Sequence, residues 1–295
     1  MNTSTAVTPR SFLWALRVCT VALAAAMALA IADAGEHRTS WAGNVAIAAW
    51  AVLVCAVVIS EVVPGPVGLT VVRVALPLSV PAAVAALVLG APFWGVVALA
   101  LSLLATLVAL SAETAEAFAQ AAAYGDERRL PLRVPAALLL PMGLSWLVWC
   151  ALTLAAVLLV GAQQWVLGLL STVAAGGLGW LLGRRFHRFS RRWLVLVPAG
   201  VVVHDHVALG ETLLIPRANV ALARLAPANT QAADLTGPAA GHAVEISVRE
   251  MVLAVLPATA AEPKGKALHV QSLLVAPLRP GRALRALAGA NVPVE

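Results

Sequence analysis

The sequence has few charged residues for its length. Only 12% of its 295 residues are Asp, Glu, Lys or Arg, whereas 61% are hydrophobic. A water-soluble domain carries about a quarter charged residues, so this deficit excludes an ordinary soluble protein. The apolar excess has to face lipid, and the sequence therefore predicts an integral membrane protein.

Lysine and cysteine are also scarce. Lys264 and Lys266 are the only lysines among twenty basic residues, and this preference for arginine, with abundant alanine and valine, is typical of GC-rich bacterial genomes. The cysteines at positions 19, 55 and 150 all lie in apolar runs. An odd number of cysteines in such runs argues against a disulfide framework and favours small packing residues.

Motifs of the common enzyme classes are absent. The sequence has no phosphate-binding P-loop, no nucleophile elbow and no dinucleotide-binding fingerprint. His204 and His206 share one face of a predicted strand, but a zinc site needs three or four ligands, and His242 and His269 are distant in sequence. We therefore expect no enzymatic activity, no cofactor and no metal site.

Six apolar runs reach the roughly 20 residues that a membrane-spanning helix needs. They cover residues 12–33, 41–63, 68–90, 92–111, 134–161 and 165–183. Strong helix formers continue the fourth run, so we expect one helix over 92–123 that projects from the membrane. The first run also has features of a cleavable signal peptide, although its length favours an anchor.

Ionisable residues avoid the middle of these runs, which argues against an ion-coupled transporter. Glu61 and Arg73 lie near run ends. Pro77 and Pro81 interrupt the third run, and neighbouring helices can bond the backbone groups that they free. This pattern favours a kinked packing helix over a substrate site, and a transporter hypothesis depends on it.

The sixth run carries small residues at four-residue spacing, namely Ala175, Gly179 and Gly183. Small residues at this spacing let two helices approach closely. The pattern predicts a packing seam, either within the bundle or in a homo-oligomer.

The distribution of arginine predicts the orientation. With six crossings and an inside N-terminus, only Arg38 falls on outer segments. Because basic residues collect on the cytoplasmic side, both termini are expected to be cytoplasmic, in a multi-pass protein of the bacterial inner (plasma) membrane. Eleven arginines fall on inner segments: Arg10, Arg17, Arg73, Arg128, Arg129, Arg133, Arg184, Arg185, Arg188, Arg191 and Arg192.

A basic junction over 184–192 follows the last run. Its arginines interleave with aromatic residues and would lie close to the membrane surface. We expect this stretch to bind anionic headgroups and not nucleic acid, although setting the orientation during insertion would also explain it. The predicted lipid contacts are Arg184, Arg185, Arg188, Arg191, Arg192 and Trp193.

A short charged loop separates the fourth and fifth runs. We expect it to contact the region around the junction through Tyr124, Asp126, Glu127, Arg128 and Arg129.

The hydrophobic period changes after residue 192. The segment 193–205 reads as a hairpin with Pro198 and Gly200 in its turn, and further strands are predicted at 212–215, 220–225, 243–248, 251–256 and 269–275. A short helix opened by Pro280 closes near Gly289, and residues 290–295 form a tail.

Seven short strands followed by a helix, over 193–289, resemble the bacterial pleckstrin-homology-like (PH-like) domains that follow transmembrane helices. The resemblance implies a mainly-β barrel closed by a helix, and it implies binding of lipids or proteins without fixing one function. We therefore expect a non-enzymatic membrane scaffold or regulatory protein whose PH-like domain binds anionic lipid or an unknown protein. A subunit of a transporter or channel is the alternative.

Overall fold

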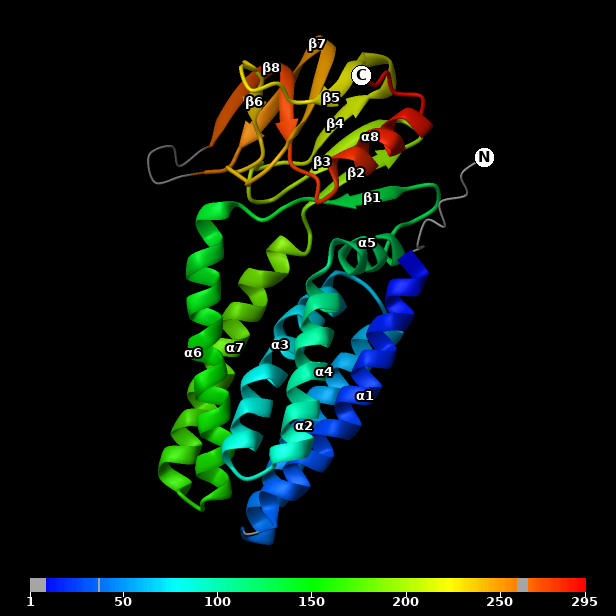
Figure 1. Ribbon diagram of the computed structural model, residues 1–295. Coiled ribbons are helices and arrows are strands. Elements are labelled where there is room, and N and C mark those ends of the chain that lie inside the picture. Colours follow the sequence, from blue (N-terminus) through cyan, green and yellow to red (C-terminus); the bar gives the residue numbers. More distant parts are fainter. Residues whose placement is uncertain (1–8, 37, 259–264) are drawn as a thin grey trace, which may run out of the picture. The chain divides into compact units, whose positions relative to one another are not determined.

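The computed structural model describes residues 9–36, 38–258 and 265–295. The chain divides into two compact units (Figure 1). The helical unit comprises Met1–Phe118 and Gly143–Phe186, and the β unit comprises Ala119–Met142 and His187–Glu295. Each unit is therefore built from two separate stretches of the chain.

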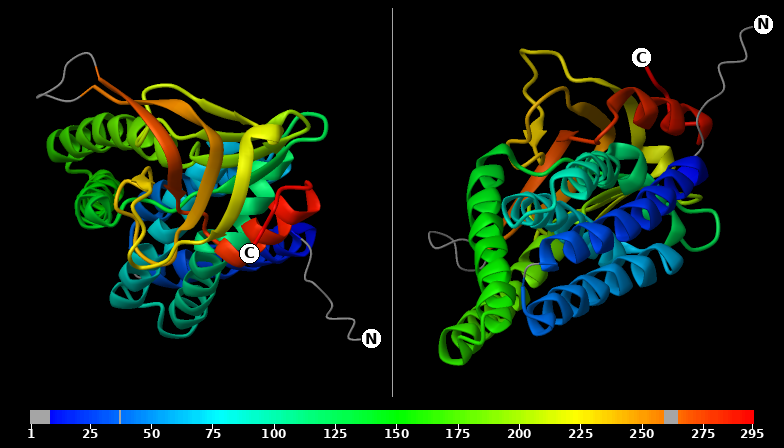
Figure 2. Two further views of the ribbon diagram at one scale, coloured as in Figure 1. Left: turned by 90° about the horizontal axis from the view of Figure 1, so that it is seen from above. Right: turned by 60° about the horizontal axis from the view of Figure 1, so that its bottom comes forward.

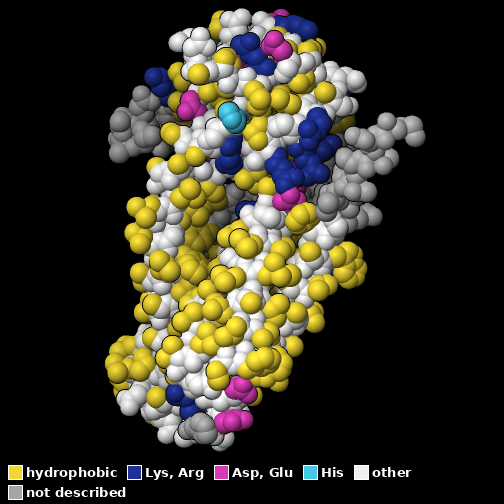
Figure 3. Space-filling view, in the orientation of Figure 1, with side chains coloured by type: hydrophobic (Ala, Val, Ile, Leu, Met, Phe, Trp, Pro, Cys, Tyr) yellow, Lys and Arg dark blue, Asp and Glu magenta, His cyan; other side chains and the backbone are white. Residues whose placement is uncertain are grey.

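The structure contains six long helices in its described residues. They are α1 (Pro9–Gly35), α2 (Ser40–Val62), α3 (Pro66–Val88), α4 (Pro92–Leu110), α6 (Ala136–Gly161) and α7 (Trp165–Phe189). All six are long and apolar enough to span a membrane, and hydrophobic side chains cover their visible face in Figure 3. These helices confirm the six predicted spans, and the protein is therefore a multi-pass membrane protein.

The helices α1 to α4 pack as neighbours through small side chains. On α4 the residues Ala98, Ser102, Ala105 and Ala109 recur every three or four positions and are all buried. Because these side chains are small, α1 and α3 approach α4 closely. The hairpin of α6 and α7 is tied to the others by the indole of Trp41, which donates to Val160 O at 3.0 Å, and that of Trp146, which donates to Val74 O at 3.1 Å.

The fourth predicted helix is not continuous. Ser111 has extended dihedral angles (φ −61°, ψ 154°) and separates α4 from α5 (Ala112–Ala121). Its hydroxyl accepts from the backbone N–H of Thr114 at 3.1 Å, which makes it the N-cap of α5. The expectation of one helix over 92–123 was wrong because composition records helix-forming tendency, whereas a capping serine starts a new helix.

The β unit contains two four-stranded sheets and no closed barrel in its described residues. The first sheet has the order β1-β2-β3-β4, in which all pairs are antiparallel. The second has the order β5-β7-β8-β6. The strands are β1 (Arg128–Pro131), β2 (Trp193–Val197), β3 (Gly200–His204), β4 (Leu213–Pro216), β5 (Val220–Leu225), β6 (Ala233–Asp234), β7 (Val244–Leu256) and β8 (Lys266–Val275).

The two sheets share one apolar core with α8 (Pro280–Gly289), which contacts β5 (Figure 2). Buried side chains from both sheets and from α8, such as Val203, Ile246 and Leu287, belong to this core. Strands followed by a C-terminal helix confirm the predicted layout of the domain. The strands predicted at 243–248 and 251–256 are one strand, β7, with a register shift between Ser247 and Val252.

The predicted loop at 124–133 contains a strand that sequence reasoning missed. Arg128 to Pro131 form β1, which pairs antiparallel with β2 so that Pro131 lies opposite Trp193. Because β1 belongs to the first sheet, the β unit begins at Ala119 and not after the last helix. The expected division at residues 183–193 is therefore incomplete, since part of the β unit precedes α6.

Candidate functional site

The basic end of α7 has the exposure that lipid contact requires. Arg184, Arg185 and Arg188 lie on α7, Arg191 follows it, and all four are exposed. The Arg184 guanidinium lies 5.6 Å from the centroid of the Trp180 ring, which is also exposed. This arrangement, a cation beside an exposed aromatic ring at the end of an apolar helix, is typical of a membrane interface.

Two residues of the predicted lipid-contact set are buried instead. The exposed fraction of Arg192 is 1% and that of Trp193 is 7%. Neither side chain can reach a headgroup in this conformation, so assigning them to the lipid surface was wrong. The physical reason is local, because Trp193 begins β2, Arg192 directly precedes it, and both face partners in the β unit.

Arg192 connects four segments that are distant in sequence. Its Nε donates to Asp205 Oδ1 at 2.8 Å and its Nη2 donates to Asp205 Oδ2 at 2.6 Å, a bidentate ion pair with both side chains fully buried. The same guanidinium donates to the backbone carbonyls of Arg133 and Thr236. Asp205 also accepts from the N–H of Val207 at 2.9 Å. The charges are thus compensated on both sides, as a buried pair requires.

Trp193 belongs to a row of stacked side chains across β1, β2 and β3. The Arg129 guanidinium lies 4.7 Å from the Trp193 ring centroid, His204 stacks on that ring at 5.5 Å, and His206 meets His204 edge-on at 4.4 Å. Burial is the main cause that lowers the pKa of His204, and His206, Arg191 and Arg129 lower it further. The His204 ring is therefore neutral at pH 7.

This pair of histidines is no metal centre in the described part of the chain. No group of three or more His, Cys, Asp or Glu residues there could hold a metal ion. Nδ1 of His204 instead lies 3.0 Å from the hydroxyl of Thr212. His242 and His269 do not complete a site with the pair.

The residues of the 124–129 segment have different surroundings. Tyr124 is 86% exposed, and Asp126 and Arg128 are exposed as well. Glu127 accepts from Arg129 at 2.9 Å, and this hydrogen bond is the main cause that lowers the pKa of Glu127. Arg129 thereby links Glu127 to Trp193, so only Tyr124, Asp126 and Arg128 remain available to a partner.

Two small residues of α7 form a packing site for one tryptophan of α6. The indole N–H of Trp149 donates to Ala175 O at 3.1 Å, and a Cβ on Gly179 would lie 2.7 Å from Trp149 Nε1. Ala175 is buried, but a Cβ on Gly183 would meet nothing within 4 Å. Ala175 and Gly179 therefore contribute to the α6–α7 contact, whereas Gly183 does not.

We expect Gly179→Ala to destabilise the α6–α7 hairpin by about 1–3 kcal/mol, because the new methyl group displaces Trp149 and its hydrogen bond. The thermal unfolding midpoint of the full-length protein in detergent measures the effect. Gly177→Ala is the matched control, since a Cβ there meets nothing within 4 Å. Gly179→Leu should lower the midpoint further. Equal midpoints for all variants would show that the contact between Trp149 and Gly179 does not stabilise the hairpin.

A polar cluster between α1 and α2 was not expected from the sequence. Glu61 is only 3% exposed, and it accepts from the hydroxyl of Thr20 at 2.6 Å. Arg17 donates to the backbone carbonyl of Glu61 at 2.8 Å. Thr20 and Arg17 lie three residues apart on α1, and this spacing was the signal that could have indicated a shared partner.

Arg73 on α3 has a structural role of the same kind. Its Nε donates to Ala109 O and its Nη2 to Ser111 O, each at 3.3 Å. These carbonyls lie at the end of α4, where no following helical turn supplies N–H groups to bond them. Arg73 therefore caps α4 and, like Glu61, satisfies its polar groups within the helical unit.

Comparison with protein-family models, with curated protein sequences and with solved structures gave no match.

Proposed function

We propose that this membrane protein is a non-enzymatic scaffold or regulator that holds a PH-like β unit at an anionic membrane surface and presents it to a partner protein. The observation that carries the proposal is the row of exposed arginines Arg184, Arg185, Arg188 and Arg191 at the end of the last spanning helix. The excess of arginine on the segments that include this row supports an orientation with both termini in the bacterial cytoplasm.

Electrostatics makes the four arginines sufficient for such contact. Each basic residue near an anionic leaflet gains on the order of 1 kcal/mol, and salt screens this attraction within about 10 Å. Two four-stranded sheets, in which β6 and β8 form the one parallel pair among the described strands, and a C-terminal helix support the PH-like assignment. The exposed Tyr124 and Asp126, which precede β1, and Arg128, its first residue, offer a polar surface to a protein partner.

The test uses the full-length protein in nanodiscs, because a fragment starting at Arg184 would lack β1. Phosphatidylglycerol carrying a photoreactive headgroup is compared with phosphatidylcholine carrying the same probe. We expect crosslinks in residues 184–191 that favour the anionic lipid and that weaken as salt rises. Changing the four arginines to glutamine should lower this crosslinking several-fold.

A control variant removes the same number of charges from the β unit, through Arg217→Gln, Arg249→Gln, Lys266→Gln and Arg285→Gln. It should leave crosslinking at 184–191 unchanged. Equal crosslinking of both lipids at low salt would restrict the arginines to a role in setting orientation and would refute the docking proposal.

The transporter alternative is supported by an apolar pocket between spanning helices. On α3 this pocket is lined by Leu78, Ala82 and Ala85, and not by Pro77, Ser79 or Pro81. The hydroxyl of Ser79 is buried and donates to Leu76 O at 2.5 Å, so it does not face this pocket. Solute flux into proteoliposomes that depends on the protein would favour this alternative.

A further inference from the structure

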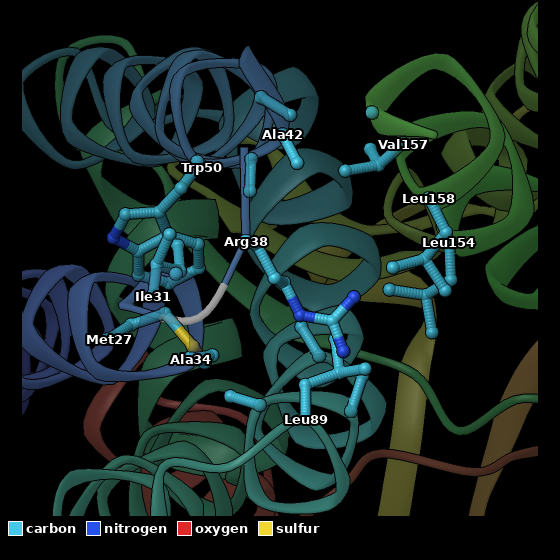
Figure 4. A pocket seen from close by; sticks show the side chains of 18 of the residues that line it. Met27, Ile31, Ala34, Arg38, Ala42, Trp50, Leu89, Leu154, Val157 and Leu158 are labelled. Atoms are coloured by element: carbon cyan, nitrogen blue, oxygen red, sulfur yellow. The ribbon is translucent and has the colours of Figure 1, made fainter. Parts of the chain in front are cut away.

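The pocket between α1, α2, α3 and α6 has a volume of about 620 Å³. This lies within the range of about 300–1,000 Å³ that is typical of small-molecule sites. Figure 4 shows its walls, with Met27 and Ile31 from α1, Trp50 from α2 and Leu154 from α6. All of these residues belong to the helical unit, so the pocket is a feature of the membrane-spanning part alone.

Small side chains keep the pocket open. On α2 the lining includes Gly43, Ala46 and Ala49, and on α3 it includes Ala82 and Ala86. The lining of α2 continues from Ala42 to Leu53, which covers about 16 Å along the helix axis at 1.5 Å per residue. The pocket is therefore a long apolar slot, and its shape suits an extended hydrocarbon chain.

Three neutral polar side chains around the slot form hydrogen bonds with the protein itself. The hydroxyl of Thr39 accepts from the N–H of Ala42, Thr153 donates to Trp149 O, and the indole of Trp50 donates to Ala24 O. The indole N–H and the hydroxyl of Thr153 have no further hydrogen to donate, whereas the hydroxyl of Thr39 keeps its own hydrogen. The lining thus offers a bound molecule one neutral donor, the hydroxyl of Thr39, which follows Arg38 in the chain.

Arg38 is the one charged side chain among the described lining residues. Its side chain extends into the pocket toward Leu89 and Leu154 at the end nearest the α1–α2 turn (Figure 4). Within the described residues its guanidinium forms no ion pair and donates no hydrogen bond. Asp33 and Glu36 lie in or beside the same turn, but neither forms an ion pair with it.

We propose that this slot binds an anionic phospholipid of the surrounding bilayer, with one acyl chain between the helices and the phosphate on Arg38. The apolar walls take hydrocarbon, and the guanidinium offers parallel N–H donors that match a phosphate. A lipid whose only accessible headgroup charge is negative fits this single unpaired cation. Because Asp33 and Glu36 weaken the long-range attraction of anions, recognition rests on the short contact with Arg38.

The experiment uses full-length protein in nanodiscs that contain phosphatidylglycerol with a photoreactive group on its acyl chain. We expect crosslinks on the peptides that contain Leu53, Leu78 and Leu154, with less labelling when phosphatidylcholine carries the same probe. Arg38→Gln should lower the affinity for phosphatidylglycerol about tenfold, the usual loss for one charge-assisted contact, and should lower that for phosphatidylcholine less, because the choline cation already compensates part of the phosphate charge.

Two variants test the slot itself. Ala46→Leu should reduce crosslinking of both lipids because it fills the cavity, and Ala46→Ser, which is close in size to alanine, should preserve it. Unlike binding at the end of α7, binding in the slot should persist at high salt, and the glutamine variant at 184–191 should retain it. Failure of the proposed surface docking would therefore leave this result intact.

Several outcomes would overturn the proposal. Acyl-chain crosslinks that are absent from the three peptides, or that are indifferent to Ala46→Leu, would mean that the slot holds no lipid. Equal affinities of the native and Arg38→Gln proteins for phosphatidylglycerol would remove the headgroup assignment. Crosslinks from these peptides to a second protein chain would show that a helix of another copy fills the slot.

Discussion

Replacing Asp205 with asparagine is expected to destabilise the β unit by about 3–5 kcal/mol, the usual effect of removing one partner from a buried ion pair. The variant leaves the Arg192 guanidinium charged and fully buried without its counter-ion. Because the total stability of a domain is about 5–15 kcal/mol, a large part of the stability of this unit depends on one carboxylate.

Hydrogen exchange of the β2 and β3 amides in the full-length protein measures this effect. In Asp205→Asn these amides should exchange roughly two to four orders of magnitude faster. The matched control is Asp126→Asn, because Asp126 is exposed and forms no ion pair in the described chain. Native exchange rates in Asp205→Asn would mean that the buried pair contributes nothing to stability.

Arg192→Lys separates charge from geometry. A lysine keeps the positive charge but presents a compact ammonium, which cannot serve both oxygens of Asp205 and the carbonyls of Arg133 and Thr236 together. We expect this variant to be destabilised nearly as strongly as Asp205→Asn. Stability equal to that of the native protein would show that charge alone is sufficient.

Gly200→Ala is expected to disrupt the first sheet. A Cβ at this position would lie 2.1 Å from Ile215 O and 2.9 Å from Arg217 N, and both are backbone atoms of the neighbouring segment. That segment cannot move away easily, because Arg217 N–H donates to Ala199 O at 2.9 Å beside the same turn. We expect a loss of about 3 kcal/mol, at the upper end of what overpacking costs.

The measurement is again hydrogen exchange, here of β3 and β4 in the full-length protein. Gly289→Ala serves as the control, since it lies at the end of α8 and a Cβ there would meet nothing within 4 Å. The control should be neutral or slightly stabilising. If Gly200→Ala matched it, the β3 and β4 backbones would have to separate freely, contrary to the register that joins Gly200 to Pro216.

The six spans and the start of α8 were predictable because their signals are local. Long apolar runs specify spanning helices wherever they occur, and Pro280 fits the first turn of a helix on its own account. The break at Ser111 was also local, but strong helix formers on both sides obscured it. Local patterns therefore predicted which helices exist better than they predicted the residues at which the helices begin and end.

Strand β1 could not be predicted in this way. Arg128 to Pro131 is short, charged and ends in proline, which is a pattern of loops. The proline is tolerated because β1 is an edge strand of its sheet. Its partner β2 begins at Trp193, so only tertiary structure makes this segment a strand.

The pair of Arg192 and Asp205, by contrast, could have been found. The hairpin register that places Trp193 opposite His204 brings the preceding and the following residue opposite each other. A lone acid at the end of one strand and a basic residue at the start of the other then predict an ion pair. Treating Arg192 as one of five equivalent arginines concealed this, since sequence position near a membrane does not decide which way a side chain faces.

The place of β1 in the chain determines the order in which the protein can be assembled. The ribosome releases β1 before α6 and α7, but its partner β2 follows them. During synthesis the backbone groups of β1 therefore cannot pair with β2 until two further helices have been made and inserted in the membrane. Such an edge is open to wrong partners during that interval. The arginines and the proline of β1 reduce this risk, because both discourage pairing with other strands, and completion of the sheet then depends on completed insertion of the last hairpin.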